Sequence, residues 1–284
     1  MNTGDSFRFA LLIANKNLIS KEYLFTNIFS IFAKILSIER LMDMAKANII
    51  ARLKKDILPL QGFKNILNAI ALDGIPAAIK NAFPNAAFPL GAVHELIADS
   101  AEDAVATFGF IAAILASMMK NAGSCIWING SQSIFPPALK SFGIRPDNII
   151  FIYLKKEKEI LWAMEEALKC KGLSAVIGEV KDLSFTASRR LQLAIEQSQV
   201  TGFIVRRNPR SLNTTACLAR WKITSLPGEL PAGMPGVGFA RWNVELLKVR
   251  NGKPGSWQLE FVGGRLKLVP TITVIHQQQQ KKTG

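Results

Sequence analysis

Residues 91–130 constrain the fold more than any other part of the chain. They begin with an apolar run over residues 91–97 that suits a buried strand, followed by a short turn over residues 98–103. Apolar residues then recur at helical spacing over residues 104–120, and a second apolar run covers residues 124–129. Strand, turn, helix and strand in this order form a βαβ unit, which predicts a parallel sheet covered by helices.

The turn of this unit lacks the residues by which a nucleotide-binding loop holds phosphate. Such a loop reads G-x-x-x-x-G-K-[ST], and its backbone N–H groups and its lysine cradle the phosphates. Here Ala98 and Asp103 occupy the glycine positions, Ala104 the lysine position and Val105 the Ser/Thr position. The complete degenerate loop consists of Ala98, Asp99, Ser100, Ala101, Glu102, Asp103, Ala104 and Val105.

Electrostatics also argue against a phosphate at this turn. Loss of the lysine removes a charge-assisted hydrogen bond worth about 1.5–3 kcal/mol. The carboxylates of Asp99, Glu102 and Asp103 would each repel a phosphate charge ~5 Å away by roughly 3 kcal/mol at an effective dielectric near ~20. The same carboxylates favour the start of a helix. We therefore expect neither a nucleotide cofactor nor ATPase catalysis.

The remaining pattern predicts a mostly parallel sheet flanked by helices, with antiparallel strands at the C-terminal side. Strands and helices alternate as far as residue 205. The strands are expected at residues 148–153, 174–180 and 201–205, and the helices at residues 135–142, 157–171 and 184–198. The antiparallel strands are expected at residues 219–224, 241–249, 258–262 and 266–269.

We expect four segments: residues 1–43, an N-terminal helix and linker over 44–89, a core domain over 90–270, and a disordered tail over 271–284. The first segment is interpreted as a non-native upstream extension, with Met42 or Met44 as the true start, or as a disordered or amphipathic segment. Its apolar run, residues 23–38, is shorter than the about 20 residues that a membrane span needs. No membrane association is therefore expected.

The net charge of +14 is concentrated in the C-terminal third of the chain. Residues 200–284 contain 13 Lys/Arg and 3 Asp/Glu, whereas residues 1–199 contain 22 and 18. A charge of this density favours an acidic partner, such as nucleic acid or an acidic protein surface. A solvated basic face without a partner is the alternative.

Metal and thiol chemistry are not expected. Cys125, Cys170 and Cys217 are far apart in apolar contexts, and no C-x-x-C pair exists. His94 and His276 have no ligand-like neighbours, so no metal site is predicted, and a reduced, cytoplasmic location is favoured. His94 lies within a buried-strand pattern, which indicates a hydrogen-bonded core histidine rather than a catalytic base.

Four strings within residues 45–270 are informative in combination. They are Phe88-Pro-Leu-Gly-Ala-Val-His-Glu-Leu96, Arg220-Trp-Lys-Ile223, Arg241-Trp-Asn-Val-Glu-Leu246 and Arg250-Asn-Gly-Lys-Pro-Gly-Ser-Trp257. With the order of elements, they resemble the ImuA family, RecA-related proteins of bacterial damage-inducible mutagenesis cassettes. The resemblance implies a RecA-like core domain, a P-loop-type fold without its ATPase.

Individual positions can be compared with RecA through this resemblance. The position of its catalytic glutamate holds Ser131, and a hydroxyl cannot serve as the general base. The acidic Walker B position corresponds to Glu179, for which a cap on the following helix is the alternative role. The two DNA-binding loops of RecA correspond to residues 181–184 and to residues 207–216, of which the second is short and basic.

The resemblance further implies an accessory role in error-prone DNA repair, namely translesion synthesis in the SOS response to DNA damage. The expected partner is ImuB, a homologue of Y-family polymerases, with RecA and single-stranded DNA as further candidates. A SulA-like inhibitor of the division GTPase FtsZ is the alternative function. The candidate residues for partner or DNA binding are Arg206, Arg207, Arg210, Arg241, Trp242, Lys248, Arg250, Lys253 and Trp257.

Overall fold

The computed structural model describes residues 44, 46, 48–50, 52–53, 72, 74–120, 123–131, 134–229, 236 and 238–269. The chain divides into two units, Met1–Leu58 and Pro59–Gly284. In the first unit the described residues are helical, in agreement with the helix predicted there. The expectations for residues 1–43 and 271–284 lie outside the described residues.

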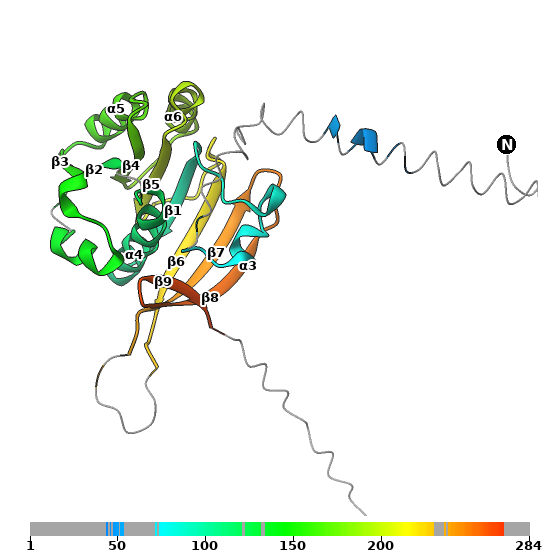
Figure 1. Ribbon diagram of the computed structural model, residues 1–284. Helices are drawn as coiled ribbons and strands as arrows, with labels where there is room; N and C mark the ends of the chain where they lie inside the picture. Colours follow the sequence, from blue (N-terminus) through cyan, green and yellow to red (C-terminus); the bar gives the residue numbers. More distant parts are fainter. Residues whose placement is uncertain are drawn as a thin grey trace, which may run out of the picture. The chain divides into compact units, whose positions relative to one another are not determined.

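The second unit is built on a sheet in which nine strands are described (Figure 1), in the order β3-β2-β4-β5-β1-β6-β7-β8-β9. The six strands from β3 to β6 in this order run parallel, and β6, β7, β8 and β9 pair antiparallel. The strands are β1 Val93–Ala98, β2 Ser124–Asn129, β3 Ile149–Tyr153, β4 Leu173–Val180, β5 Thr201–Arg207, β6 Ala219–Leu226, β7 Arg241–Val249, β8 Gly255–Val262 and β9 Arg265–Leu268. The predicted fold class is confirmed.

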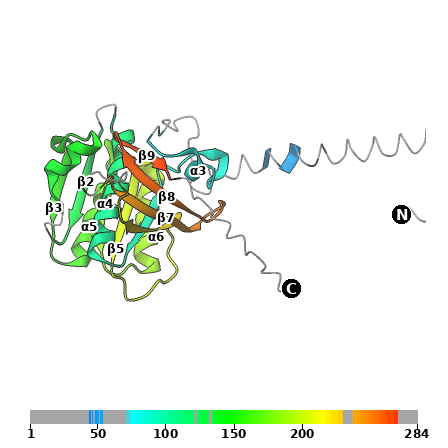
Figure 2. The ribbon, with the colours of Figure 1, turned by 90° about the horizontal axis from the view of Figure 1, so that it is seen from below.

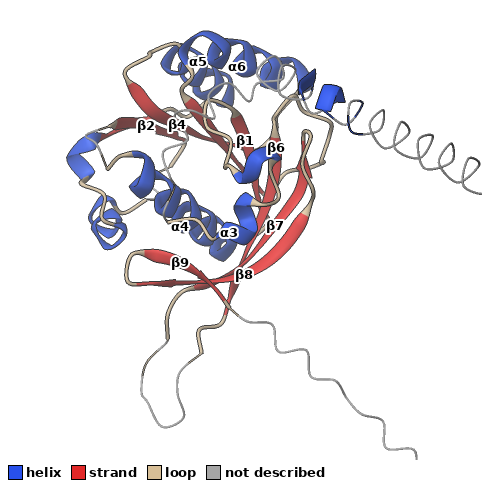
Figure 3. Ribbon diagram, turned by 45° about the vertical axis from the view of Figure 1, so that its right-hand side comes forward, coloured by secondary structure: helices blue, strands red, loops and turns tan. Residues whose placement is uncertain are grey.

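Helices cover both faces of the parallel strands. Figure 3 shows α5 and α6 together on one side and α4 on the other. The α-helices of this unit are α3 Ala77–Lys80, α4 Ala101–Met118, α5 Glu157–Leu168 and α6 Phe185–Ser198. Three 3₁₀ helices connect the elements: η1 Pro84–Ala86, η2 Pro136–Phe142 and η3 Pro146–Asn148. The predicted helix over residues 135–142 is therefore 3₁₀ rather than α.

Alternation along the strands decides which side chains meet which helix layer. On β2, Ile128 belongs to the core cluster beneath α5 and α6, together with Met164 of α5 and Leu191 of α6. The neighbouring Trp127 points the other way, and its ring centroid lies 5.5 Å from that of Phe108 on α4. Because successive strand residues face opposite sides, both faces of the sheet are apolar and both need a helix layer.

Helix α4 is the central buried helix of the fold. It is the one helix, among the residues searched, that is long and apolar enough to cross a membrane, and most of it is buried within this fold.

The segment after α3 is hydrogen-bonded to the turn between β7 and β8. The N–H of Lys253 in this turn donates to the carbonyl oxygen of Ala82 at 2.8 Å. Figure 2 shows α3 beside these C-terminal strands.

His94 lies in an aromatic cluster between β1 and α4, as predicted for a core histidine. It is fully buried, and its ring stacks on Phe88 with the centroids 4.8 Å apart. The Nε2 group is 2.8 Å from the carbonyl oxygen of Pro89, and the Nε1–H of Trp221 donates to Nδ1 at 3.3 Å. These partners fit a neutral ring protonated at Nε2.

Acid is expected to destabilise the protein through His94. Desolvation by burial lowers the pKa of His94 to about 4, whereas an unfolded histidine titrates near ~6.5. As pH falls between these values the unfolded chain binds a proton that the folded chain does not, so the free energy of unfolding decreases, by about 3 kcal/mol at most. Urea denaturation at neutral and acidic pH measures this loss. His94→Gln should flatten the dependence in this window, and an unchanged pH dependence in that variant would contradict the assignment.

Candidate functional site

The turn between β1 and α4 is much shorter than a phosphate-binding loop. Only Asp99 and Ser100 join the two elements. Ser100 is the N-cap: its Oγ accepts from the N–H of Asp103 at 3.0 Å, and its carbonyl oxygen accepts from the N–H of Ala104 at 3.1 Å. The predicted six-residue turn over residues 98–103 is wrong, because the acidic residues already form the first helical turn, where the helix dipole favours them.

Two of the acidic side chains at this turn are tied to β6. Asp103 Oδ1 accepts from the N–H of Ser225 at 3.0 Å. Asp99 Oδ2 lies 2.8 Å from Nζ of Lys222, and this hydrogen bond raises the pKa of Lys222. The carboxylates therefore have a structural role that sequence reasoning did not foresee: they fasten the start of α4 to the neighbouring strand.

The positions that correspond to the catalytic acids of RecA lie on neighbouring strands. Ser131 is exposed just beyond β2. Glu179 is buried near the end of β4, and its Oε2 is 3.6 Å from Nη1 of Arg207 on β5. Ser184 caps α6 by accepting from the N–H of Ala187 at 3.1 Å. The N-cap of this helix is therefore Ser184 and not Glu179.

A buried ionic cluster lies on the α6 side of β1. The carboxylate of Glu95 is fully buried and bridges two guanidinium groups: Oε1 is 2.9 Å from Nη1 of Arg206, and Oε2 is 2.9 Å from Nε of Arg220. The hydroxyl of Thr215 donates to Oε2 at 2.7 Å. Buried charges persist only when they are paired and hydrogen-bonded, and this cluster satisfies both conditions.

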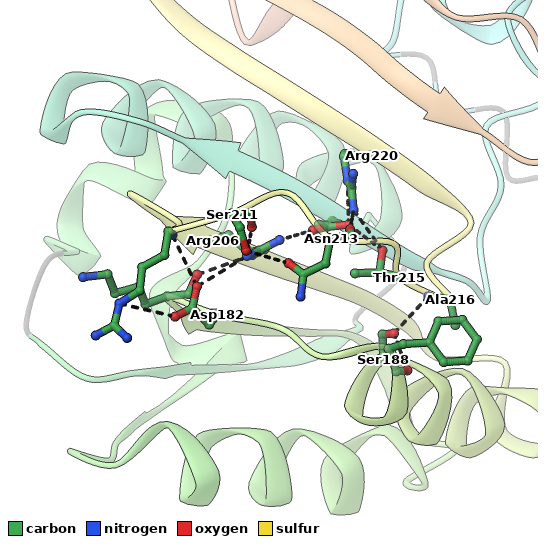
Figure 4. A network of polar contacts seen from close by, with 12 residues as sticks. Asp182, Ser188, Arg206, Ser211, Asn213, Thr215, Ala216 and Arg220 are labelled. Carbon is green, nitrogen blue, oxygen red and sulfur yellow. Dashed lines mark hydrogen bonds and ion pairs between the residues drawn. The ribbon is translucent and has the colours of Figure 1, made fainter.

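The same cluster holds the loop over residues 208–218, which connects β5 to β6 (Figure 4). The Nη2 group of Arg206 donates to the carbonyl oxygen of Ser211 at 2.8 Å. Farther along the loop, the N–H of Ala216 donates to Oγ of Ser188 on α6 at 2.9 Å. The conformation of this loop therefore depends on a buried ion pair beneath it.

Sequence reasoning missed Glu95, Arg220 and Lys222 as organising residues. The one local signal is the charge of Glu95 inside an otherwise apolar run, because a charge in a buried strand requires a partner. Its partners lie more than a hundred residues away in sequence. Only the parallel register of β5, β1 and β6 brings them together.

Two of the nine candidate binding residues lie in the interior, so their predicted role as surface contacts is wrong. Arg206 is fully buried because it neutralises Glu95. Trp242 is buried between the sheet and α4, with its ring stacked on Phe261 at a centroid distance of 6.2 Å. Neither side chain is therefore available at the surface of this fold.

The other seven candidates are exposed (Arg210, Lys248, Lys253) or half-buried (Arg207, Arg241, Arg250, Trp257). Strand β7 runs antiparallel to β6, so Arg241 lies at the end of the sheet where the parallel strands end. Lys248 lies at the other end, where the parallel strands begin. Arg241 is also paired with Glu260 at 3.3 Å. The structure therefore divides the predicted basic surface between the two ends of the strands. Arg207 and Arg210 lie at or just after the end of β5, where the parallel strands end.

The cysteines differ in their surroundings. Cys125 and Cys217 are buried, and burial raises the pKa of each thiol to about 12, which keeps them protonated at neutral pH. Cys170 is exposed, so the prediction of an apolar environment for it is wrong. Within the described ranges no group of three or more His, Cys, Asp or Glu is placed to hold a metal ion.

Comparison with known proteins identifies two relatives of similar sequence. The chain is 31% identical over 195 residues to Protein ImuA of Caulobacter vibrioides strain NA1000 / CB15N, covering 64% of this chain and 80% of the relative. Protein ImuA of strain ATCC 19089 / CIP 103742 / CB 15 matches with the same identity and coverage. No protein-family model matches the chain.

Proposed function

The chain belongs to the ImuA family, and from this premise we propose that it is a non-catalytic accessory protein of error-prone DNA repair. It acts in damage-induced mutagenesis in the cytoplasm by binding an ImuB-like homologue of Y-family polymerases. RecA and single-stranded DNA are its further candidate partners. The observation that carries the proposal is the similarity to Protein ImuA over 80% of that relative's length.

The two-residue turn before α4 supports the non-catalytic part of this proposal. A phosphate-binding loop presents several free backbone N–H groups and a lysine. Here the N–H groups of Asp103 and Ala104 already donate to Ser100. The cation at the turn, Lys222, is engaged by Asp99.

The protein is expected neither to bind nor to hydrolyse ATP. The helix start offers few free N–H donors, and Asp99, Glu102 and Asp103 repel phosphate. Equilibrium dialysis with labelled ATP and Mg²⁺ at millimolar concentration is the measurement, and only background retention is expected. Saturable binding that is lost on substitution of Ser100 or Asp99 would contradict the non-catalytic assignment.

The basic residues at the end of β5 are the part of the surface that we propose for an acidic partner. The side chain of Arg210 is 78% exposed and only loosely paired with Asp182, at 3.8 Å. Arg207, three residues earlier in the chain, neutralises the buried Glu179. Arg210 is therefore the better residue to substitute, because Arg207→Ala would also disturb a buried carboxylate.

The proposal is tested by damage-induced mutation frequency in a strain that lacks this gene, complemented by the wild type or by variants. Wild type should restore mutagenesis and co-purify with the polymerase-like partner. Arg210→Glu should reduce both, whereas the matched control Lys267→Glu, at an exposed lysine on the edge strand β9, should not. Normal mutagenesis without the gene would contradict the proposal. Cell filamentation on overproduction of the protein, without any effect on mutagenesis, would favour a division inhibitor instead.

Salt dependence separates a protein partner from single-stranded DNA. Contacts with single-stranded phosphates release counterions, so the logarithm of DNA affinity falls with the logarithm of salt with a slope of about −0.7 per contact. A protein interface with an apolar centre depends less on salt. A loss of DNA affinity in Arg210→Glu together with a flatter slope would assign this residue to DNA.

A further inference from the structure

The two edges of the described sheet carry different protection against pairing with another chain. Strand β9 forms one edge and contains two exposed cations, Arg265 and Lys267. Strand β3 forms the other edge and reads Ile-Ile-Phe-Ile-Tyr over Ile149–Tyr153, without charge or proline. Lysine and proline on an edge strand discourage intermolecular pairing, whereas a flat apolar edge invites it. Only the β3 edge is therefore suited to accept another strand.

The outer side of β3 is open in the described part of the chain. Strand β2 is the only described strand that pairs with β3. Ile150 is 53% exposed and Tyr153 is 46% exposed, although both belong to a strand of apolar and aromatic residues. An edge strand presents a row of N–H and C=O groups that a further strand can bond.

The residues that flank β3 carry a charge pattern that is complementary to itself. Asp147 lies four residues before Phe151 and Lys155 four residues after it, and Arg145 and Glu157 lie six residues before and after. All four charged residues are exposed. Among the described residues, neither Asp147 nor Lys155 has an ion-pair partner. Opposite charges at equal distances from a central residue match when two copies of one segment run antiparallel.

We propose that β3 pairs antiparallel with β3 of a second copy of this chain, about a two-fold axis at Phe151. In this register Phe151 faces its own copy, Ile149 faces Tyr153, and Ile150 faces Ile152. Two-fold symmetry makes each of the latter contacts occur twice. One sheet then runs through both copies.

Beyond the strand ends this register brings together Asp147 with Lys155 and Arg145 with Glu157. Asp147 lies in the 3₁₀ helix η3, outside the strand. These contacts are therefore made by side chains that reach across beyond the paired backbone. Glu157 already accepts from the N–H of Lys181 at 2.8 Å through Oε1, which leaves the Asp147–Lys155 pair as the cleaner contact. The two pairs also explain why a second copy, rather than an arbitrary strand, fits this edge.

Sedimentation equilibrium of the full chain over the micromolar range tests the proposal. A five-residue strand pair is small compared with a standard interface, so a dimer of micromolar affinity is expected, with twice the monomer mass of 31.2 kDa. Asp147→Lys places two lysines opposite each other, and Lys155→Asp places two aspartates there. Each variant alone is expected to weaken self-association by about tenfold, because each contact occurs twice.

A mixture of the two charge-reversal variants gives the sharpest result. Every facing pair in the mixed dimer has opposite charges, so the mixture should associate as tightly as the wild type. Lys267→Asp on β9, the matched control for charge, should leave association unchanged, and Ile150→Lys should abolish it without changing the circular dichroism spectrum. A monomeric wild type, single variants that associate normally, or a mixture that fails to recover would each overturn the proposal.

Discussion

Glu95→Ala is expected to lower the free energy of unfolding by about 3–5 kcal/mol, because it removes the close, buried counter-ion of two guanidinium groups and leaves Arg206 only its contact with Asp182 at 3.6 Å. The carboxylate lies 2.9 Å from Nη1 of Arg206 and 2.9 Å from Nε of Arg220, and Arg206 is fully buried. Thr215 also loses the acceptor of its hydroxyl. Urea denaturation monitored by circular dichroism measures the loss as a shift of the midpoint at constant slope.

An exposed carboxylate provides the matched control. Glu159 forms an ion pair with Lys156 at 3.0 Å, and both side chains are solvent-exposed. Glu159→Ala is therefore expected to cost less than about 1 kcal/mol. Glu95→Gln, which keeps an oxygen for Thr215 but removes the charge, should fall between the two alanine variants. Similar losses for Glu95→Ala and Glu159→Ala would contradict the importance of burial.

The buried cluster also connects stability with the surface proposed for partner binding. Arg206 contacts Glu95 with one nitrogen of its guanidinium group and the carbonyl of Ser211 with another. The loop that begins after Arg207 and carries Arg210 is therefore anchored from below by an interior charge. A variant at Glu95 can reduce partner binding without any direct contact, so binding data for this loop need a stability measurement beside them.

Much of the fold follows from local sequence patterns. The boundaries of β2 and β7 agree with their predicted ranges, and α6 begins one residue after the predicted start. These elements have strong periodicity or a clear cap, as at Ser184. The β1–α4 turn was harder to predict, because acidic residues fit both a loop and a first helical turn.

The candidate site was less accessible to sequence reasoning, because the register of distant strands determines it. The pairing of Glu95 with Arg206 and Arg220 depends on two parallel strand pairs. Charge alone predicts a surface position for a basic residue, and this prediction fails for Arg206 because its position on β5 faces the interior. The burial of Trp242 could have been predicted: Trp242, Val244 and Leu246 alternate along β7, and all three are buried.

Trp242→Ala is expected to cost about 3–5 kcal/mol of unfolding free energy, as large-to-small substitutions in a core do. The tryptophan ring lies against Gly109 of α4, where an added Cβ would be 2.6 Å from Cζ2 of the ring. Gly109→Ala alone is therefore expected to destabilise by about 1–3 kcal/mol through overpacking. Chemical denaturation of each variant gives both values.

The double variant distinguishes direct packing from independent effects. Once Trp242 is alanine, the methyl group at position 109 no longer meets the ring, and alanine is favoured over glycine in a helix by about 1 kcal/mol. Gly109→Ala should therefore change sign and stabilise the Trp242→Ala background. Trp162→Ala, at a tryptophan 62% exposed on α5, is the control and should change stability by less than about 0.5 kcal/mol. Additive losses at positions 109 and 242 would show that the two residues do not pack together. A Trp242→Ala variant with unchanged stability but weakened partner binding would show that Trp242 contacts the partner at the surface.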